Sequence, residues 1–128
     1  MVENVQLGAF SMSLNVADLE ASAAFYEKLG FSSLGGDSSG GYLMMKSGDT
    51  VIGLFQGHIP ANTLTFNPGW TPSATEIEGE WDDIRSIQST LDDAGIELVE
   101  RCEADGEGPA HIVLLDPDRN AILIDQHR

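Results

Sequence analysis

The chain has 128 residues, which is enough for one domain with one hydrophobic core, and its 41% hydrophobic content argues against a disordered protein. Its net charge of −15, from 21 acidic and 6 basic residues, disfavours nucleic-acid binding because phosphate would be repelled. No apolar run approaches the roughly 20 residues of a membrane span, and the N-terminal stretch lacks the features of a secretory signal. The lone Cys102 agrees with a reducing compartment, so we expect a cytoplasmic protein.

The first half of the chain predicts one strand, one helix and three further strands. Apolar and polar residues alternate from Phe10 to Val16, which is typical of a half-buried strand. Asp18 is expected to cap a helix that ends at Gly30. The apolar residues of this helix recur at helical spacing and are Leu19, Ala23, Phe25, Tyr26 and Leu29. The extended stretches that follow are Phe31–Leu34, Tyr42–Lys46 and Val51–Gln56.

The second half predicts the same order of elements. We expect a strand at Thr75–Gly79 and a helix capped by Asp82 and ended by Gly95. Its apolar positions are Ile84, Ile87, Leu91 and Ala94, and the strands expected after it are Glu97–Arg101, His111–Leu115 and Ala121–Asp125. About half the chain length separates Gly30 from Gly95, as an internal duplication requires.

These elements predict an α+β fold in a single domain. Two βαβββ repeats, at about residues 7–56 and 73–126, are joined by a linker at residues 57–72. Helices must cover the apolar side of a sheet, because both elements bury their apolar faces against each other. We therefore expect an open, cupped, mixed sheet with the helices on its outer face.

Side-chain alternation along the strands divides the sheet into a covered and an uncovered face. Phe10, Met12 and Leu14 of the first strand are expected beneath the helix, as are Ile52 and Leu54 of a later strand. The residues expected on the uncovered face are Ser11, Ser13, Gly53, Phe55, Glu76, Leu123 and Asp125. Small and apolar positions with a few polar groups suit a ligand pocket, and the alternative is a face that packs against another subunit.

The linker mixes aromatic and amide side chains. Phe66 and Trp70 suit the gripping of a ligand, and core packing is an equally good interpretation of both. Tyr42, Met44 and Met45 lie on a neighbouring strand, where a methionine pair could adapt to an irregular apolar ligand or fill the core.

Four segments resemble the vicinal oxygen chelate superfamily, which includes glyoxalases, extradiol dioxygenases and bleomycin-resistance proteins. They read NVADLEASAAFYEKLGF, VIGLF, WDDIRSIQSTLDDAGIE and LLDPDRNAILIDQ, and with their order they cover nearly the whole chain. The resemblance implies paired βαβββ motifs that form an open, cupped barrel, and it implies a homodimer.

The resemblance also implies a metal site built from four strand positions. In this sequence these positions hold Ser11, Gly53, Glu76 and Leu123, of which Glu76 alone could bind a divalent metal tightly. Catalytic metals need three protein ligands and one open position, so we expect neither a metal nor another cofactor. A relocated site remains an alternative, since His111 could pair with Glu76, or His127 with Asp125.

The leading hypothesis is a metal-free protein that binds a small molecule, similar in principle to bleomycin-resistance proteins. The predicted ligand-binding residues are Ser11, Ser13, Phe55, Phe66, Trp70, Glu76, Leu123 and Asp125. The alternative is a lyase or isomerase similar to glyoxalase that acts on a small carbonyl compound, with Glu76 as catalytic general base. A third possibility is a structural or regulatory dimer. In each case we expect no nucleic-acid or membrane partner.

Overall fold

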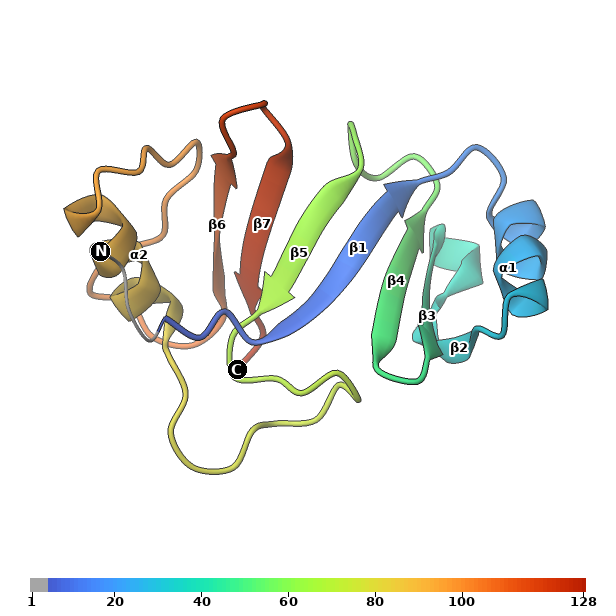
Figure 1. Cartoon of the computed structure of the whole chain (residues 1–128), viewed down its shortest axis with the longest axis horizontal. Helices are drawn as coiled ribbons and strands as arrows, with labels where there is room; N and C mark the ends of the chain where they lie inside the picture. The colour runs from blue at the N-terminus through green and yellow to red at the C-terminus, as the bar shows by residue number, and fades with distance from the viewer. Residues whose placement is uncertain (1–4) are drawn as a thin grey trace. The chain divides into compact units, whose positions relative to one another are not determined.

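The computed structural model describes residues 5–128 and divides the chain into two compact units. The N-terminal unit is Ser11–Thr63, and the C-terminal unit joins the residues up to Phe10 with Leu64–Arg128. Each unit contains one helix and part of a mixed sheet (Figure 1). The predicted α+β class is therefore confirmed. Neither helix among the described residues is long and apolar enough to cross a membrane.

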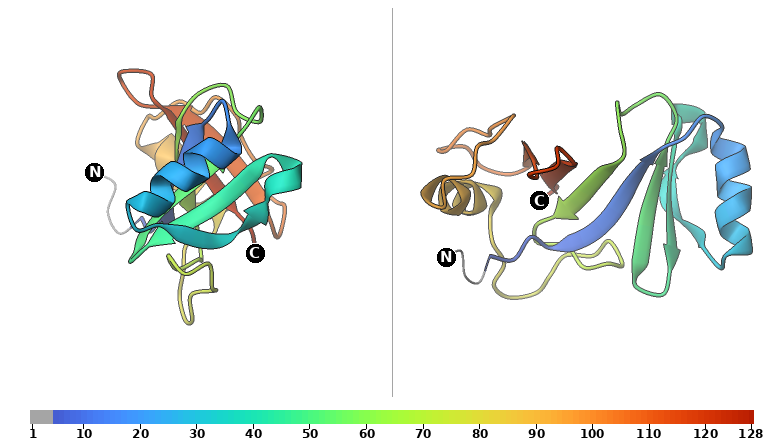
Figure 2. Two further views of the ribbon diagram at one scale, coloured as in Figure 1. Left: turned by 90° about the vertical axis from the view of Figure 1, so that its right-hand side faces the viewer. Right: turned by 45° about the horizontal axis from the view of Figure 1, so that its top comes forward.

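The N-terminal unit is a complete βαβββ motif. It contains β1 (Ala9–Asn15), α1 (Leu19–Lys28), β2 (Ser32–Asp37), β3 (Tyr42–Ser47) and β4 (Thr50–Phe55), with the short 3₁₀ turn Ser38–Gly40 between β2 and β3. The strand order is β2-β3-β4-β1, in which β4 pairs antiparallel with β3 and parallel with β1. Helix α1 lies across one face of these strands (Figure 2, left).

The core of the N-terminal unit lies between α1 and its strands. The buried residues are Leu19, Met45, Ile52 and Leu54, and Met12, Leu14 and Leu43 pack around them. The predicted burial of Ile52 and Leu54 beneath the helix is therefore confirmed. Phe10 was expected there too, but its side chain is 42% exposed and its ring lies 5.2 Å from that of Phe66, and both residues belong to the C-terminal unit. That part of the prediction is wrong, because β1 extends beyond the residues that the helix covers.

The C-terminal unit contains β5 (Thr63–Asn67), α2 (Ile84–Asp93), β6 (Ala110–Leu115) and β7 (Ala121–Gln126), in the strand order β5-β7-β6. Strands β6 and β7 are antiparallel. Its buried core comprises Ile84, Ile87, Leu91, Ile112, Leu114 and Ile124. The burial expected for Ile84, Ile87 and Leu91 is confirmed, whereas that expected for Ala94 is wrong, because Ala94 is the exposed C-cap residue of α2.

The predictions of two strands in the C-terminal unit are wrong. Residues 75–79 form no strand and contribute a single bridge between Trp70 and Glu76, whereas β5 lies inside the segment expected to be an irregular linker. The reason is that the alternating stretch Thr63–Asn67 packs Phe66 against the core, while residues 76–80 include three glutamates.

The strand expected at Glu97–Arg101 is reduced to one bridge between Glu100 and Val113. The side chain of Gln88 holds the neighbouring backbone instead. Its Oε1 accepts a hydrogen bond from the Cys102 N–H at 2.9 Å, and its Nε2 donates to the Cys102 carbonyl at 3.1 Å. A buried side chain on α2 thus replaces the ladder that a full strand would supply.

The N-terminus of each helix is capped by an aspartate and by a glutamine side chain. Asp18 caps α1 as predicted, accepting from the Ala21 N–H at 3.1 Å, and the Gln56 Oε1 accepts from the Leu19 N–H at 2.7 Å. Helix N-termini leave backbone N–H groups without intrahelical partners, and these contacts satisfy two of them. The glutamine follows directly after the last residue of β4.

In α2 the cap is Asp83 and not the predicted Asp82, whose carboxylate instead accepts from the Gln6 N–H. Gln126 takes the role of Gln56, since its Oε1 accepts from the Ile84 N–H at 2.6 Å. Its Nε2 donates to the Asp83 carboxylate at 3.0 Å and to the Gly108 carbonyl at 3.1 Å. In each half of the chain, a glutamine at or just after the end of a strand therefore accepts a hydrogen bond from the N-terminus of the helix that precedes that strand.

The Asp83 carboxylate experiences opposing influences. Partial burial raises its pKa, but hydrogen bonds from the Arg85 N–H and the Gln126 amide, together with the Arg85 charge, outweigh this, so the pKa lies below its ordinary value. The ionised cap therefore stabilises the fold at neutral pH, and this contribution is lost as the pH falls through the lowered pKa.

We expect Gln126→Ala to lower the free energy of unfolding by about 2–4 kcal/mol, because it removes a buried amide and leaves several polar partners unsatisfied. Gln56→Ala is the matched change, and it should cost about 1 kcal/mol because Gln56 is exposed. Urea denaturation followed by circular dichroism measures both. Equal losses for the two variants would contradict the proposed difference in burial.

Candidate functional site

The sheet face of the N-terminal unit that points away from α1 carries several of the predicted ligand-binding residues. Met12 and Leu14 of β1 and Ile52 and Leu54 of β4 pack toward α1. Alternation then places the remaining residues of these strands on the other face. They include Ser11, Ser13 and Asn15 of β1, Tyr42, Met44 and Lys46 of β3, and Val51, Gly53 and Phe55 of β4.

Gly53 lies at the centre of this face. It pairs with Ser13 on one side and with Met44 on the other. A Cβ atom built on Gly53 would lie 2.6 Å from Phe55 Cε2 and 3.0 Å from Met44 Sδ. The space above this backbone position is thus filled by an aromatic ring and a thioether, and no larger side chain fits there without displacing them.

An aromatic pair extends from this centre along β3 and β4. Tyr42 is the register partner of Phe55, and their rings are stacked with centroids 6.0 Å apart and an angle of 9° between the planes. Tyr42 is 37% exposed. Tyrosine combines a large apolar surface with a polar hydroxyl, which suits contact with a bound molecule.

Sequence reasoning selected Phe55 but did not select Tyr42 as a ligand-binding residue. The missed signal is the two-residue turn Gly48–Asp49, since a hairpin turn of this length sets the register of the strands that it joins. With Ser47 opposite Thr50, that register places Tyr42 opposite Phe55.

The two serines of this face are buried. Ser11 is 4% exposed and Ser13 is 5% exposed. In this structure their hydroxyls therefore offer little surface to a ligand. The accessible part of the face around Gly53 is contributed by aromatic and thioether groups, and Lys46 is partly exposed on the same face.

In the C-terminal unit, the predicted residues Leu123 and Asp125 share one face of β7. Leu123 pairs with Val113, and Asp125 pairs with His111. The Asp125 carboxylate lies 3.5 Å from His127 Nε2, which is one of the two pairings considered from the sequence. The other pairing is wrong, because His111 Nε2 lies 3.4 Å from Glu100 and not beside Glu76.

Phe66 and Trp70 occupy separate environments in the C-terminal unit. Phe66 packs against the core beneath α2. Trp70 forms a bridge with Glu76, and its buried indole N–H has no hydrogen-bond acceptor among the described residues.

Glu76 is tied to Arg128. Its Oε1 lies 3.7 Å from Arg128 Nη2, and its side chain is 60% exposed. Arg128 Nη1 also donates to the Gly69 and Ile77 carbonyls, and the guanidinium lies 4.4 Å from the Trp81 ring centroid. Arg128 therefore holds the two ends of the loop that carries Glu76.

The residues at the family's metal positions do not fit a metal ion. Ser11 is a buried hydroxyl, Leu123 has no donor atom, and the space at Gly53 is filled by Phe55 and Met44. Across residues 5–128, no group of three or more His, Cys, Asp or Glu side chains is arranged to hold a metal ion. A catalytic metal site needs about three such ligands.

We expect Gly53→Ala to lower the free energy of unfolding by about 1–3 kcal/mol, because the added methyl group would overlap Phe55 and Met44. Gly35→Ala on β2 is the matched control, since nothing lies within 4 Å of a Cβ there, and it should change stability by less than about 1 kcal/mol. Chemical denaturation compares the two. A neutral Gly53→Ala would show that the face above β4 is loosely packed.

Comparison with known structures supports this fold. A protein titled NAD-dependent benzaldehyde dehydrogenase from Legionella pneumophila has a TM-score of 0.66 at 14% identity, covering 93% of this chain and 99% of that one. A glyoxalase/bleomycin resistance protein/dioxygenase superfamily member from Vibrio splendidus 12B01 has a TM-score of 0.62 at 12% identity, covering 91% and 97%. At these identities the likeness shows the fold alone. No curated protein matches the chain.

The match to a protein family is extensive. The model of the Glyoxalase/Bleomycin resistance protein/Dioxygenase superfamily matches residues 8–124. This range includes both described helices, strands β1 to β6 and the first four residues of β7. The chain therefore belongs to the glyoxalase/bleomycin resistance protein/dioxygenase superfamily.

Proposed function

We propose that the chain binds a small, partly apolar molecule on the sheet face of its N-terminal unit and does so without a metal. The observation that carries this proposal is the filling of the position at Gly53. At this position, where the resemblance implies a metal ligand, Phe55 and Met44 pack over the backbone. The centre of this face thus offers apolar and π contacts.

The aromatic pair defines the ligand class. Tyr42 and Phe55 stack nearly parallel and present a flat surface, and Met44 adds a polarizable group that adapts to irregular shapes. A planar ring can stack on such a surface, and a cationic ring gains additional attraction from the negative faces of aromatic side chains. The net charge of −15 also attracts cations over distance. We therefore propose a planar aromatic ligand, with a cationic form preferred to an anionic one.

The hypothesis of an enzyme with Glu76 as general base is not favoured by a comparable observation. A carboxylate that abstracts a proton from carbon benefits from a desolvated setting that raises its pKa. Glu76 is instead 60% exposed and lies beside the Arg128 guanidinium. The roles of Glu76, Trp70, Leu123 and Asp125 in ligand binding remain predictions.

A thermal-shift panel tests the proposal with bicyclic aromatic compounds in matched cationic, neutral and anionic forms. A ligand present at ten times its Kd should stabilise the fold by about 1.4 kcal/mol and raise Tm by roughly 4–6 °C. We expect the cationic member of a set to bind more tightly than the anionic one. The same compounds titrated by calorimetry should bind Tyr42→Ala about tenfold more weakly, because half of the aromatic pair is removed.

Leu34→Ala is the control variant, since Leu34 on β2 is 36% exposed and matches Tyr42 in exposure. It should leave the affinity unchanged. Equal weakening by both variants, or no stabilisation by any compound of the panel, would contradict the proposed binding face.

The homodimer implied by the resemblance also remains a proposal. Light scattering of the purified protein in solution would support it with a mass about twice that of one chain.

A further inference from the structure

The N-terminal unit has an open groove on the helix side of its strands. The groove has a volume of about 400 Å³ and lies between the end of β1, residues 21–26 of α1 and Asn62. Ligand pockets commonly occupy about 300–1,000 Å³, so the groove is large enough for a small ring compound. It is separate from the face that carries Tyr42 and Phe55, because Leu14 in its lining belongs to the α1 side of the sheet.

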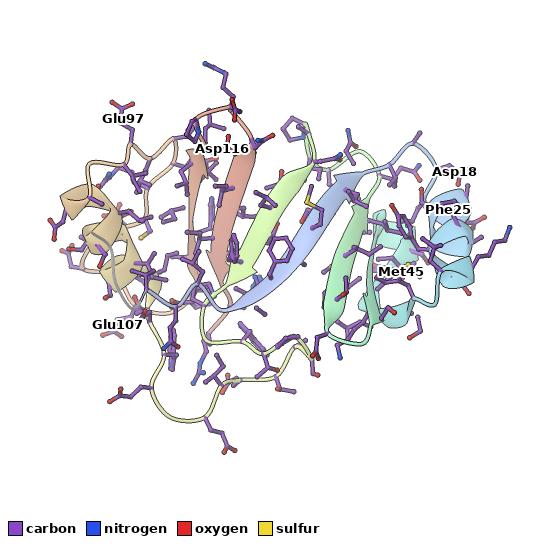
Figure 3. The ribbon with its side chains drawn as sticks, viewed as in Figure 1. Asp18, Phe25, Met45, Glu97, Glu107 and Asp116 are labelled. Carbon is purple, nitrogen blue, oxygen red and sulfur yellow. The ribbon has the colours of Figure 1, made fainter. Side chains whose placement is uncertain are left out.

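An exposed but braced aromatic ring forms one part of the groove. The labelled side chain of Phe25 projects from α1 (Figure 3). It is 58% exposed, although phenylalanine is among the residues most often buried. Its ring meets that of Tyr26 edge to face at 5.3 Å, and Tyr26 meets Phe31 in the same manner at 5.7 Å. The ring is therefore supported from one side by its neighbours while much of its surface stays open to the solvent.

An oriented amide forms another part. The Asn62 Oδ1 accepts a hydrogen bond from the Asn15 N–H at 2.8 Å. This contact assigns the oxygen of the amide to the β1 side, so its Nδ2 group is the hydrogen-bond donor of Asn62. A carbonyl oxygen is the simplest partner for such a donor.

The lining is uncharged, although the chain as a whole is strongly acidic. None of the groove's residues is an Asp, Glu, Lys, Arg or His. The nearby N-terminus of α1 does not offer an anion site, because the Leu19 and Ala21 N–H groups are already bonded to Gln56 and Asp18. The Asp18 carboxylate at this helix end would also repel an anion. The groove therefore favours a neutral ligand.

We propose that this groove is a second binding site, selective for small neutral planar molecules that carry a carbonyl group. The ring of the ligand packs on Phe25 and on the apolar side chains of Leu14 and Val16. Its carbonyl oxygen accepts a hydrogen bond from Asn62 Nδ2. The site is distinct from the binding proposed for the opposite face, since its lining contains none of Tyr42, Met44 and Phe55.

Benzamide is the probe, with benzoate and benzamidinium as anionic and cationic compounds of the same shape. In two-dimensional NMR of the isotope-labelled protein, benzamide should shift the backbone signals of Ala21, Ser22 and Asn62 with a Kd in the millimolar range. Benzoate should bind at least tenfold more weakly, and benzamidinium should be weakened too because the cation lacks a carbonyl oxygen.

Two variants and one control assign the contacts. Phe25→Ala should weaken benzamide at least fivefold, and Asn62→Asp should do the same because it keeps the acceptor for the Asn15 N–H but removes the donor. Leu29→Ala is the control, since Leu29 lies on the same helix face, is 60% exposed and does not line the groove. The affinity of this control variant for benzamide should equal that of the unchanged protein.

Several outcomes overturn the proposal. They are equal affinities in all three variants, equal binding of benzamide and benzoate, and shifts confined to Tyr42, Met44 and Phe55 on the opposite face. The last result would instead support the proposed function. Shifts at the groove without any at the opposite face would support the second site even if the first proposal fails.

Discussion

The structure depends on the coupling of each helix to the end of a strand through one glutamine amide. Gln56 follows β4 and closes α1, and Gln126 ends β7 and closes α2. Each contact satisfies a backbone N–H that a helix N-terminus otherwise leaves unpaired, and it sets where the helix begins relative to the sheet. Because the helix covers one face of its strands, this placement also decides which strand residues remain on the other face. The buried Gln126 makes more of these contacts than Gln56, since its amide also donates to the Asp83 carboxylate and the Gly108 carbonyl.

The two units differ in how firmly their helices are packed. Helix α2 buries Ile84, Ile87, Gln88 and Leu91, whereas α1 buries Leu19 alone among its residues. Loose coverage leaves Phe25 on the surface and a groove beside it. The N-terminal unit, which has all four expected strands, is thus the one whose helix side remains open. In the C-terminal unit a loop stands where the sequence predicted a strand, and Gln88 of α2 holds that loop.

Much of the fold could be predicted from the sequence because local patterns and packing agree. The Asp18 cap, the stop at Gly30 and the alternation in β4 follow rules that involve neighbouring residues only. The predictions failed where contacts between residues distant in the sequence determine the local structure. Strand β5 was hidden in a segment rich in turn residues, and Asp83 displaced Asp82 because Gln126, distant in the sequence, bonds to its carboxylate. For the site, parity selected Gly53 correctly as a position facing away from α1. It could not show that Met44 and Phe55 fill the space above that residue, since this depends on the register between β3 and β4.

Charge and binding chemistry are separated in this chain. Three of its arginines pair with carboxylates, Arg85 with Asp83, Arg101 with Asp92 and Arg128 with Glu76, so much of the scarce positive charge is used to hold segments of the C-terminal unit. The acidic excess remains and favours the approach of cations over distance. At short range, the aromatic pair with its neighbour Met44 presents rings and a thioether, and the groove at α1 presents mainly rings and amide groups. In the proposed binding, the long-range field therefore raises the local concentration of cations and disfavours anions, and short-range contacts add discrimination by shape and hydrogen bonding.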